Sequence, residues 1–219
     1  GTRPARGFWG FSTDPLSSSE GVRANSLPGD ADHIRCPGGV RPRVEAVSVT
    51  SEIARARSLI RVVPDHPSPG VAFQDITPLL ADARALRACV EALVAPFEGR
   101  FDLVAGLEAR GFLLAGAAAV LTGTGLVPLR KAGRLPAPAA RADYTLEYGT
   151  ASIEVSEDLR AGSRVLLLDD VLATGGTLAA GRRLIEARGA EVVGAACLLE
   201  LTALGGRAVV PDTHVLFAS

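Results

Sequence analysis

The 219-residue chain has no methionine, a single tryptophan, a single lysine and three cysteines, and aromatic residues make up only 5% of it. Because 47% of the residues are hydrophobic, we expect a core of aliphatic side chains and alanine. Cys36, Cys89 and Cys197 are far apart and form no C-x-x-C pair, which argues against a zinc site or a disulfide framework. Inert thiols in a reducing, cytoplasmic environment are the expectation.

Neither sign of charge is in excess, since 23 basic and 24 acidic residues give a formal net charge of −1. This balance gives no global electrostatic reason to bind nucleic acid or a membrane surface. No apolar run reaches the roughly 18 residues of a membrane span. We therefore expect neither nucleic acid nor membrane as a partner, and any anion site must be local.

Residues 1–47 differ from the rest of the chain. They are rich in Gly, Pro, Ser and Arg and show no sustained period of 2 or 3.6. We predict a poorly ordered extension here and a globular domain over residues 48–219. A transit peptide or a basic interaction arm is an alternative, but the acidic residues of this segment count against both.

From residue 48 onward, apolar strands alternate with helical patterns. The predicted helices are 51–62, 82–97, 111–121 and 176–188, and the predicted strands are 103–107, 126–130, 151–155, 164–168, 191–201 and 214–217. A long polar stretch, 131–149, is interpreted as a loop. Such alternation predicts the α/β class, with a central, mostly parallel sheet flanked by helices.

The most specific pattern spans residues 166–177, where an apolar strand leads to two acids, a glycine-rich turn and a helix. In open α/β sheets, ligands bind beyond the carboxyl ends of the strands. Glycines let backbone N–H groups approach an anion, and a helix N-terminus adds free donors. The residues of this predicted phosphate cradle are Ala173, Thr174, Gly175, Gly176 and Thr177. Asp169 and Asp170 are suited to accept hydrogen bonds from ribose hydroxyls and to hold Mg²⁺ through water.

This motif resembles the phosphoribosyl pyrophosphate (PRPP) site of the type I phosphoribosyltransferases. In that family the turn binds the 5-phosphate and the two acids bind the ribose hydroxyls. The family fold adds a small N-terminal hood and a mobile loop. The segment 67–80, PSPGVAFQDITPLL, resembles the hood of the adenine phosphoribosyltransferase family in particular. The resemblance implies that Phe73 stacks on the base, flanked by Ala72 and Gln74, although Gln74 replaces the family's usual basic residue.

Two more segments carry the same resemblance. Arg110, in Gly-Leu-Glu-Ala-Arg-Gly-Phe, opens a helix after a strand and offers a planar fork for pyrophosphate. Arg130, Lys131 and Arg134 form a cationic loop that would neutralise the departing pyrophosphate. The match of Leu-Glu-Tyr-Gly to the family implies that Glu147 is the general acid or base.

The resemblance implies an enzyme that joins PRPP and adenine to give AMP and pyrophosphate, with Mg²⁺ as cofactor and a homodimer as the assembly. Enzymes for another base, such as xanthine, hypoxanthine, guanine or orotate, share the phosphate site and stay open as alternatives. A PRPP-sensing regulator is a further alternative, disfavoured by the near-zero net charge and by the presence of the cationic loop.

Overall fold

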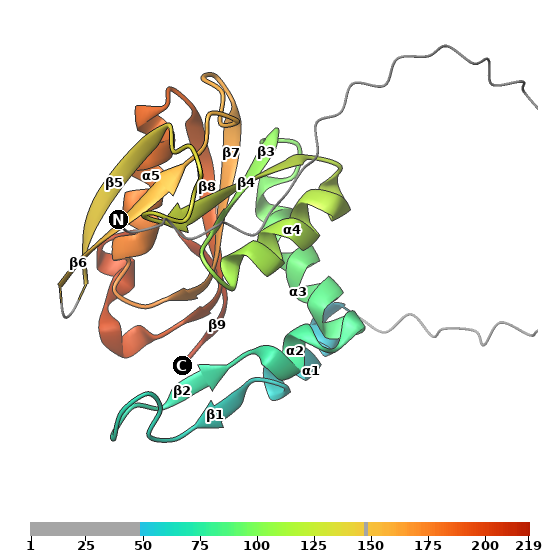
Figure 1. The fold of residues 1–219 in the computed structure, drawn as a ribbon. Coiled ribbons are helices and arrows are strands. Elements are labelled where there is room, and N and C mark those ends of the chain that lie inside the picture. The colour runs from blue at the N-terminus through green and yellow to red at the C-terminus, as the bar shows by residue number, and fades with distance from the viewer. Residues whose placement is uncertain (1–48, 147–148) are drawn as a thin grey trace, which may run out of the picture. The chain divides into compact units, whose positions relative to one another are not determined.

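The computed structural model describes residues 49–146 and 149–219 (Figure 1). Its helices are α1 (Val49–Ser58), α2 (Thr77–Leu80), α3 (Ala83–Val94), α4 (Gly111–Thr122) and α5 (Gly176–Ala187), with short 3₁₀ turns at Ala95–Phe97, Thr202–Leu204 and Gly206–Ala208. Its strands are β1 (Arg61–Val63), β2 (Phe73–Asp75), β3 (Leu103–Leu107), β4 (Gly125–Lys131), β5 (Ala140–Leu146), β6 (Gly149–Val155), β7 (Arg164–Leu172), β8 (Glu191–Glu200) and β9 (His214–Ala218).

Seven of these strands form one sheet in the order β5-β6-β4-β3-β7-β8-β9. The five strands from β4 to β9 in this order run parallel, while β5 and β6 pair antiparallel at one edge. Helices cover both faces, as parallel sheets require. The predicted α/β class with a mostly parallel sheet is therefore confirmed.

Two apolar layers enclose the sheet. Helices α3 and α4 lie on one face of the sheet and α5 on the other (Figure 1). The apolar layer of the first face, to which α1 also contributes, includes Leu93, Leu114 and Leu166, and that of the second includes Leu167 and Leu184. Alternate residues of β7 point to opposite faces, which is why Leu166 and Leu167 belong to different layers. The two layers fix β7 at the centre of the sheet, between β3 and β8.

The small hood of the predicted fold is the antiparallel pair of β1 and β2, which forms a sheet of its own. The predicted helix over 51–62 ends at Ser58, and the rest of that prediction is wrong, because residues 61–63 form β1 instead. Two adjacent valines followed by proline favour an extended strand over a helical turn.

Two further predictions need correction. The predicted loop over 131–149 contains β5, whose alternation of small apolar and polar residues pairs with β6 along its length. The predicted strand 164–168 continues to Leu172, because Val171 and Leu172 extend the ladder with β8. The helix predicted over 82–97 begins at Ala83 and ends at Val94, followed by the 3₁₀ turn. As expected, the Asp82 carboxylate caps it by accepting from the amides of Arg84 and Ala85.

Candidate functional site

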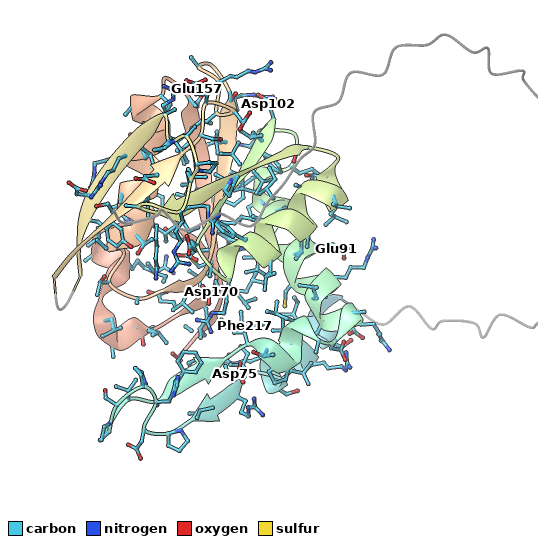
Figure 2. The ribbon with its side chains drawn as sticks, in the orientation of Figure 1. Asp75, Glu91, Asp102, Glu157, Asp170 and Phe217 are labelled. Atoms are coloured by element: carbon cyan, nitrogen blue, oxygen red, sulfur yellow. The ribbon has the colours of Figure 1, made fainter. Side chains whose placement is uncertain are left out.

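The paired acids lie on β7, at the carboxyl end of the sheet. Strand β3 pairs with β7 only as far as Gly106 opposite Leu168, so Asp169 and Asp170 lie beyond this pairing, while the ladder between β7 and β8 continues past them. Figure 2 shows Asp170 at the end of the sheet near β2, while Asp102 lies at the opposite end. The position agrees with the rule that parallel sheets bind ligands beyond the carboxyl ends of their strands.

Both carboxylates are buried, with 8% of Asp169 and 7% of Asp170 exposed. Burial, and after it the charge of Asp170, raises the pKa of the Asp169 carboxyl well above its ordinary range. Arg110 places Nε 2.7 Å from Asp170 Oδ2. Within the described part of the chain that oxygen receives no hydrogen bond of good geometry, so the contact is an ion pair only. The carboxyl end of the sheet thus holds one buried carboxylate oxygen, Asp170 Oδ2, that accepts no hydrogen bond from the described residues.

The predicted phosphate cradle joins β7 to α5. Gly175 adopts a φ of +81° and precedes the first turn of α5, whose N-terminal amides have no partner inside the helix. A Cβ on Gly175 would lie 2.7 Å from the carbonyl oxygen of Gly206. A Cβ on Gly206 would in turn collide with the carbonyl of Ala173. The Gly205-Gly206 loop therefore packs directly against the backbone of the cradle, a contact that the sequence did not indicate.

Phe73 lies on β2, near the carboxyl end of the large sheet. The guanidinium carbon of Arg110 is 5.2 Å from the centre of the Phe73 ring, and the His66 ring meets Phe73 edge-on at 5.0 Å. Arg110 therefore contacts both Phe73 and Asp170, so three segments far apart in sequence meet at one arginine. The flanking residues Ala72 and Gln74 are exposed and half-buried, respectively.

Asp75, labelled in Figure 2, fixes the strand that carries Phe73. Its carboxylate accepts from the amide of Thr77 at 2.9 Å and pairs with Arg61 on β1. Hydrogen bonds from Thr77, and then from Arg61, lower the pKa of Asp75 to about 2. The position of Phe73 is thus set by β1 as well as by its own strand.

Two of the three predicted cationic side chains, and the backbone of the third residue, contact one carboxylate. Glu108, between β3 and α4, accepts from the amide of Lys131 at 2.8 Å and lies 3.0 Å from Arg134 Nη1. Arg130 Nε is 3.6 Å from the same carboxylate. The sequence pattern assigned no role to Glu108. Its position at the end of a strand, next to Arg110, was the available signal.

Glu147 lies outside the described residues, so its predicted role stays a prediction. Among residues 49–146 and 149–219, no group of three or more His, Cys, Asp or Glu side chains could hold a metal ion by itself. No helix in these described ranges is long and apolar enough to cross a membrane.

Comparison with known proteins agrees with this geometry. Residues 74–217 match the family model described as the phosphoribosyl transferase domain. The chain is 55% identical over 170 residues to the adenine phosphoribosyltransferase of Renibacterium salmoninarum, covering 77% of this chain and 92% of that protein.

Solved structures give the same result. The crystal structure of adenine phosphoribosyltransferase from Rhodothermus marinus superposes with a TM-score of 0.74 at 44% identity, covering 78% of this chain and 99% of that one. The Saccharomyces cerevisiae enzyme, crystallised with an iminoaltritol bisphosphate and adenine, has a TM-score of 0.70 at 34% identity, covering 76% and 97%. The chain therefore belongs to the phosphoribosyl transferase domain family and, within it, to the adenine phosphoribosyltransferases.

Proposed function

We propose that this protein transfers the 5-phosphoribosyl group of PRPP to adenine, giving AMP and pyrophosphate in purine salvage. The observation that carries the proposal is the meeting of three segments at Arg110, which pairs with Asp170 at 2.7 Å and lies over Phe73 at 5.2 Å. The segments expected to hold the base, the pyrophosphate and the ribose phosphate therefore meet at the carboxyl end of the sheet.

In this proposal the cradle formed by residues 173–177 holds the 5-phosphate. The amides of the first turn of α5 donate to the phosphate oxygens, and Thr174 and Thr177 add hydroxyl donors. Asp169 and Asp170 accept hydrogen bonds from the ribose hydroxyls. A ribose hydroxyl could donate a hydrogen bond to the buried oxygen of Asp170 that receives none from the described residues.

The reaction exchanges one bond at carbon 1 of the ribose for another. The bond to the pyrophosphate oxygen breaks, and a bond to the adenine nitrogen forms on the opposite face. Arg110, Arg130, Lys131 and Arg134 stabilise the negative charge that develops on pyrophosphate. Phe73 holds the planar base by stacking, while backbone groups of Ala72 and Gln74 border its edge. Glu147 takes the proton that the adenine nitrogen releases.

The acid pair also fits Mg²⁺ held through substrate. Asp169 and Asp170 are adjacent buried carboxylates with one cation, Arg110, in direct contact among the described side chains. Their oxygens would bind the ion through water, since Mg²⁺ favours a few carboxylates plus substrate phosphates. When bound, Mg²⁺ supplies charge neutralisation for the departing pyrophosphate.

We further propose that residues 48–219 form the catalytic domain, that the enzyme is a homodimer and that it works in the cytoplasm. The apolar residues Leu113, Val120 and Leu121 of α4 are exposed in the single chain, which supports burial against a second copy. The free, buried thiols of Cys89 and Cys197 are consistent with a reducing compartment.

The test is AMP formation from adenine, PRPP and Mg²⁺, measured beside parallel reactions with hypoxanthine, guanine, xanthine and orotate. We expect adenine to have the highest kcat/KM, and Phe73→Ala to raise the KM for adenine more than the KM for PRPP. Glu147→Ala should lower turnover by about a hundredfold or more with PRPP binding retained. Preference for another base would refute the substrate, and turnover within a few-fold of wild type would refute the role of Glu147.

A further inference from the structure

Two buried carboxylates hold the cationic turn 130–134 from opposite sides. Glu108, whose side chain is 6% exposed, accepts from the amide of Lys131 and contacts the guanidinium groups of Arg130 and Arg134. Glu154, on β6 and 5% exposed, accepts from the amide of Gly133 at 2.9 Å. The two carboxylates thus hold the backbone of the turn at Lys131 and Gly133, on either side of the bond from the Ala132 amide to the Ser152 carbonyl. Two of its three cationic side chains share one carboxylate.

These carboxylates are unexpected beside a site for pyrophosphate. Burying a carboxylate costs free energy, and a negative charge so close to the site repels the anionic substrate. The contacts of Glu108 indicate what offsets this cost. Long arginine side chains lose much rotamer freedom when they are ordered, and a carboxylate that holds them in place beforehand spares the substrate that loss.

We propose that Glu108 and Glu154 are positioning residues that hold the turn 130–134 in the conformation that receives pyrophosphate. The inference rests on the proposed function and adds two residues to its binding machinery. Glu108 sets the directions of Arg130 and Arg134 and the path of the chain at Lys131. Glu154 sets the path at Gly133, two residues further on. Neither carboxylate touches the reacting atoms.

Substitution by glutamine separates positioning from simple repulsion. Glutamine keeps an oxygen that can accept from the Lys131 amide but removes the charge that holds the two arginines. If repulsion dominates, Glu108→Gln tightens the binding of PRPP. If positioning dominates, it weakens binding, because both guanidinium groups lose their ion pair with Glu108, although Arg130 keeps the bond from its Nη1 to the Arg134 carbonyl. The two accounts predict changes of opposite sign.

The experiment compares wild type, Glu108→Gln, Glu108→Asp and Glu154→Ala, the last of which removes the acceptor of the Gly133 amide. For Glu108→Gln we expect the KM for PRPP and the inhibition constant of pyrophosphate to rise about tenfold, as for the loss of one charged hydrogen-bonded contact. The KM for adenine should stay within about twofold. Glu108→Asp, which keeps the charge, should recover part of the loss. Glu91→Gln is the matched control, since Glu91 forms an exposed ion pair with Arg87 on α3, far from the turn in sequence.

An unchanged or lower KM for PRPP in folded Glu108→Gln would overturn the inference, and so would equal increases in the KM values of both substrates. If Glu108→Gln does not fold, as judged by circular dichroism, Glu154→Ala, which removes the acceptor of the Gly133 amide, gives the decision by the same criteria. Failure of the wild-type enzyme to convert adenine and PRPP would instead refute the proposed function. The two failures are therefore distinguishable.

Discussion

At the scale of single residues, Asp169 illustrates how a binding site opposes stability. Its carboxyl group is buried next to Asp170, and both causes raise its pKa. The folded protein therefore holds the Asp169 proton to higher pH than the unfolded chain does. The stability that this group contributes to folding is therefore greatest at low pH and falls as the pH rises from 3.8, the ordinary pKa of the group, through its raised pKa in the folded protein.

We predict that Asp169→Asn is more stable than wild type at neutral pH and nearly inactive. The amide oxygen can still accept from the Asp170 amide, now without a buried charge. Thermal unfolding followed by circular dichroism should show a higher Tm, by about 2–4 °C for each kcal/mol gained. Asp102→Asn, at the opposite end of the sheet, removes an ion pair with Arg164 and should not raise the Tm. A lower Tm for Asp169→Asn would contradict this account.

Asp75 gives the opposite dependence of stability on pH, because its pKa is lowered on folding. Its pKa is about 2 in the folded protein, so its contribution to stability is present above 3.8 and is lost as the pH falls from there to about 2. We predict that Asp75→Asn has a lower Tm than wild type at pH 6 and that the difference shrinks as the pH falls toward 2. The measurement is Tm against pH for both proteins. A difference that is constant across this range would show that the carboxylate charge is not the cause.

At the scale of elements, the strands and helices with strong periodicity were predictable. The strand 103–107 and the start of α4 at Gly111 agree with the sequence pattern, because consecutive apolar residues and an alanine-rich helix leave little choice. Strand β5 was missed because three cations and several Pro and Gly residues dominate the stretch before it. Its alternation becomes meaningful only once β6 pairs with it.

Contacts between elements were beyond the sequence for the same reason. Arg110, Phe73 and the acids could each be selected from local motifs, but not the ion pair or the ring contact that joins them. The contacts of Glu108 and Glu154 with the cationic turn depend on how β4 lies between β3 and β6. Such contacts follow from the order of strands in the sheet, which no local pattern encodes.

The support of the phosphate cradle by the Gly205-Gly206 loop gives a prediction at this scale. A methyl group on Gly206 would press on the Ala173 carbonyl and come within 2.8 Å of the Leu172 side chain. Gly206→Ala should therefore displace the cradle, raise the KM for PRPP roughly tenfold and lower stability by about 1–3 kcal/mol.

Gly205→Asn is the matched control for this loop. Position 205 has a φ of +66°, which asparagine tolerates, and its Cβ would meet no atom within 4 Å. We expect its KM for PRPP to stay within about twofold of wild type. Equal effects of the two substitutions would show that the loop does not act through contact with the cradle.

At the scale of the whole molecule, the exposed apolar residues of α4 are the feature that a single chain does not explain. Val120 is 85% exposed and borders a groove of about 670 Å³ between α3 and α4, lined by Leu86, Val90 and Ala117.

We predict that the wild-type protein sediments as a dimer of 22.6 kDa chains and that Val120→Arg shifts it toward the monomer. A charge placed in a desolvated interface is costly, so the dissociation constant should rise by at least about a hundredfold. Analytical ultracentrifugation over a range of concentrations gives the measurement. Leu204→Arg, at an exposed position after β8, is the control and should leave the assembly unchanged. A wild-type protein that is monomeric at all concentrations would refute the proposed assembly.

The close approach of α4 to β7 has a consequence for how the sequence can vary. A Cβ on Gly111 would lie 2.9 Å from Asp169 Oδ1 and 3.1 Å from the carbonyl oxygen of Leu168. The Leu168 carbonyl belongs to the backbone and would stay in place if the acid at 169 were replaced by a smaller residue. Glycine at 111 should therefore persist in relatives whichever residue occupies position 169.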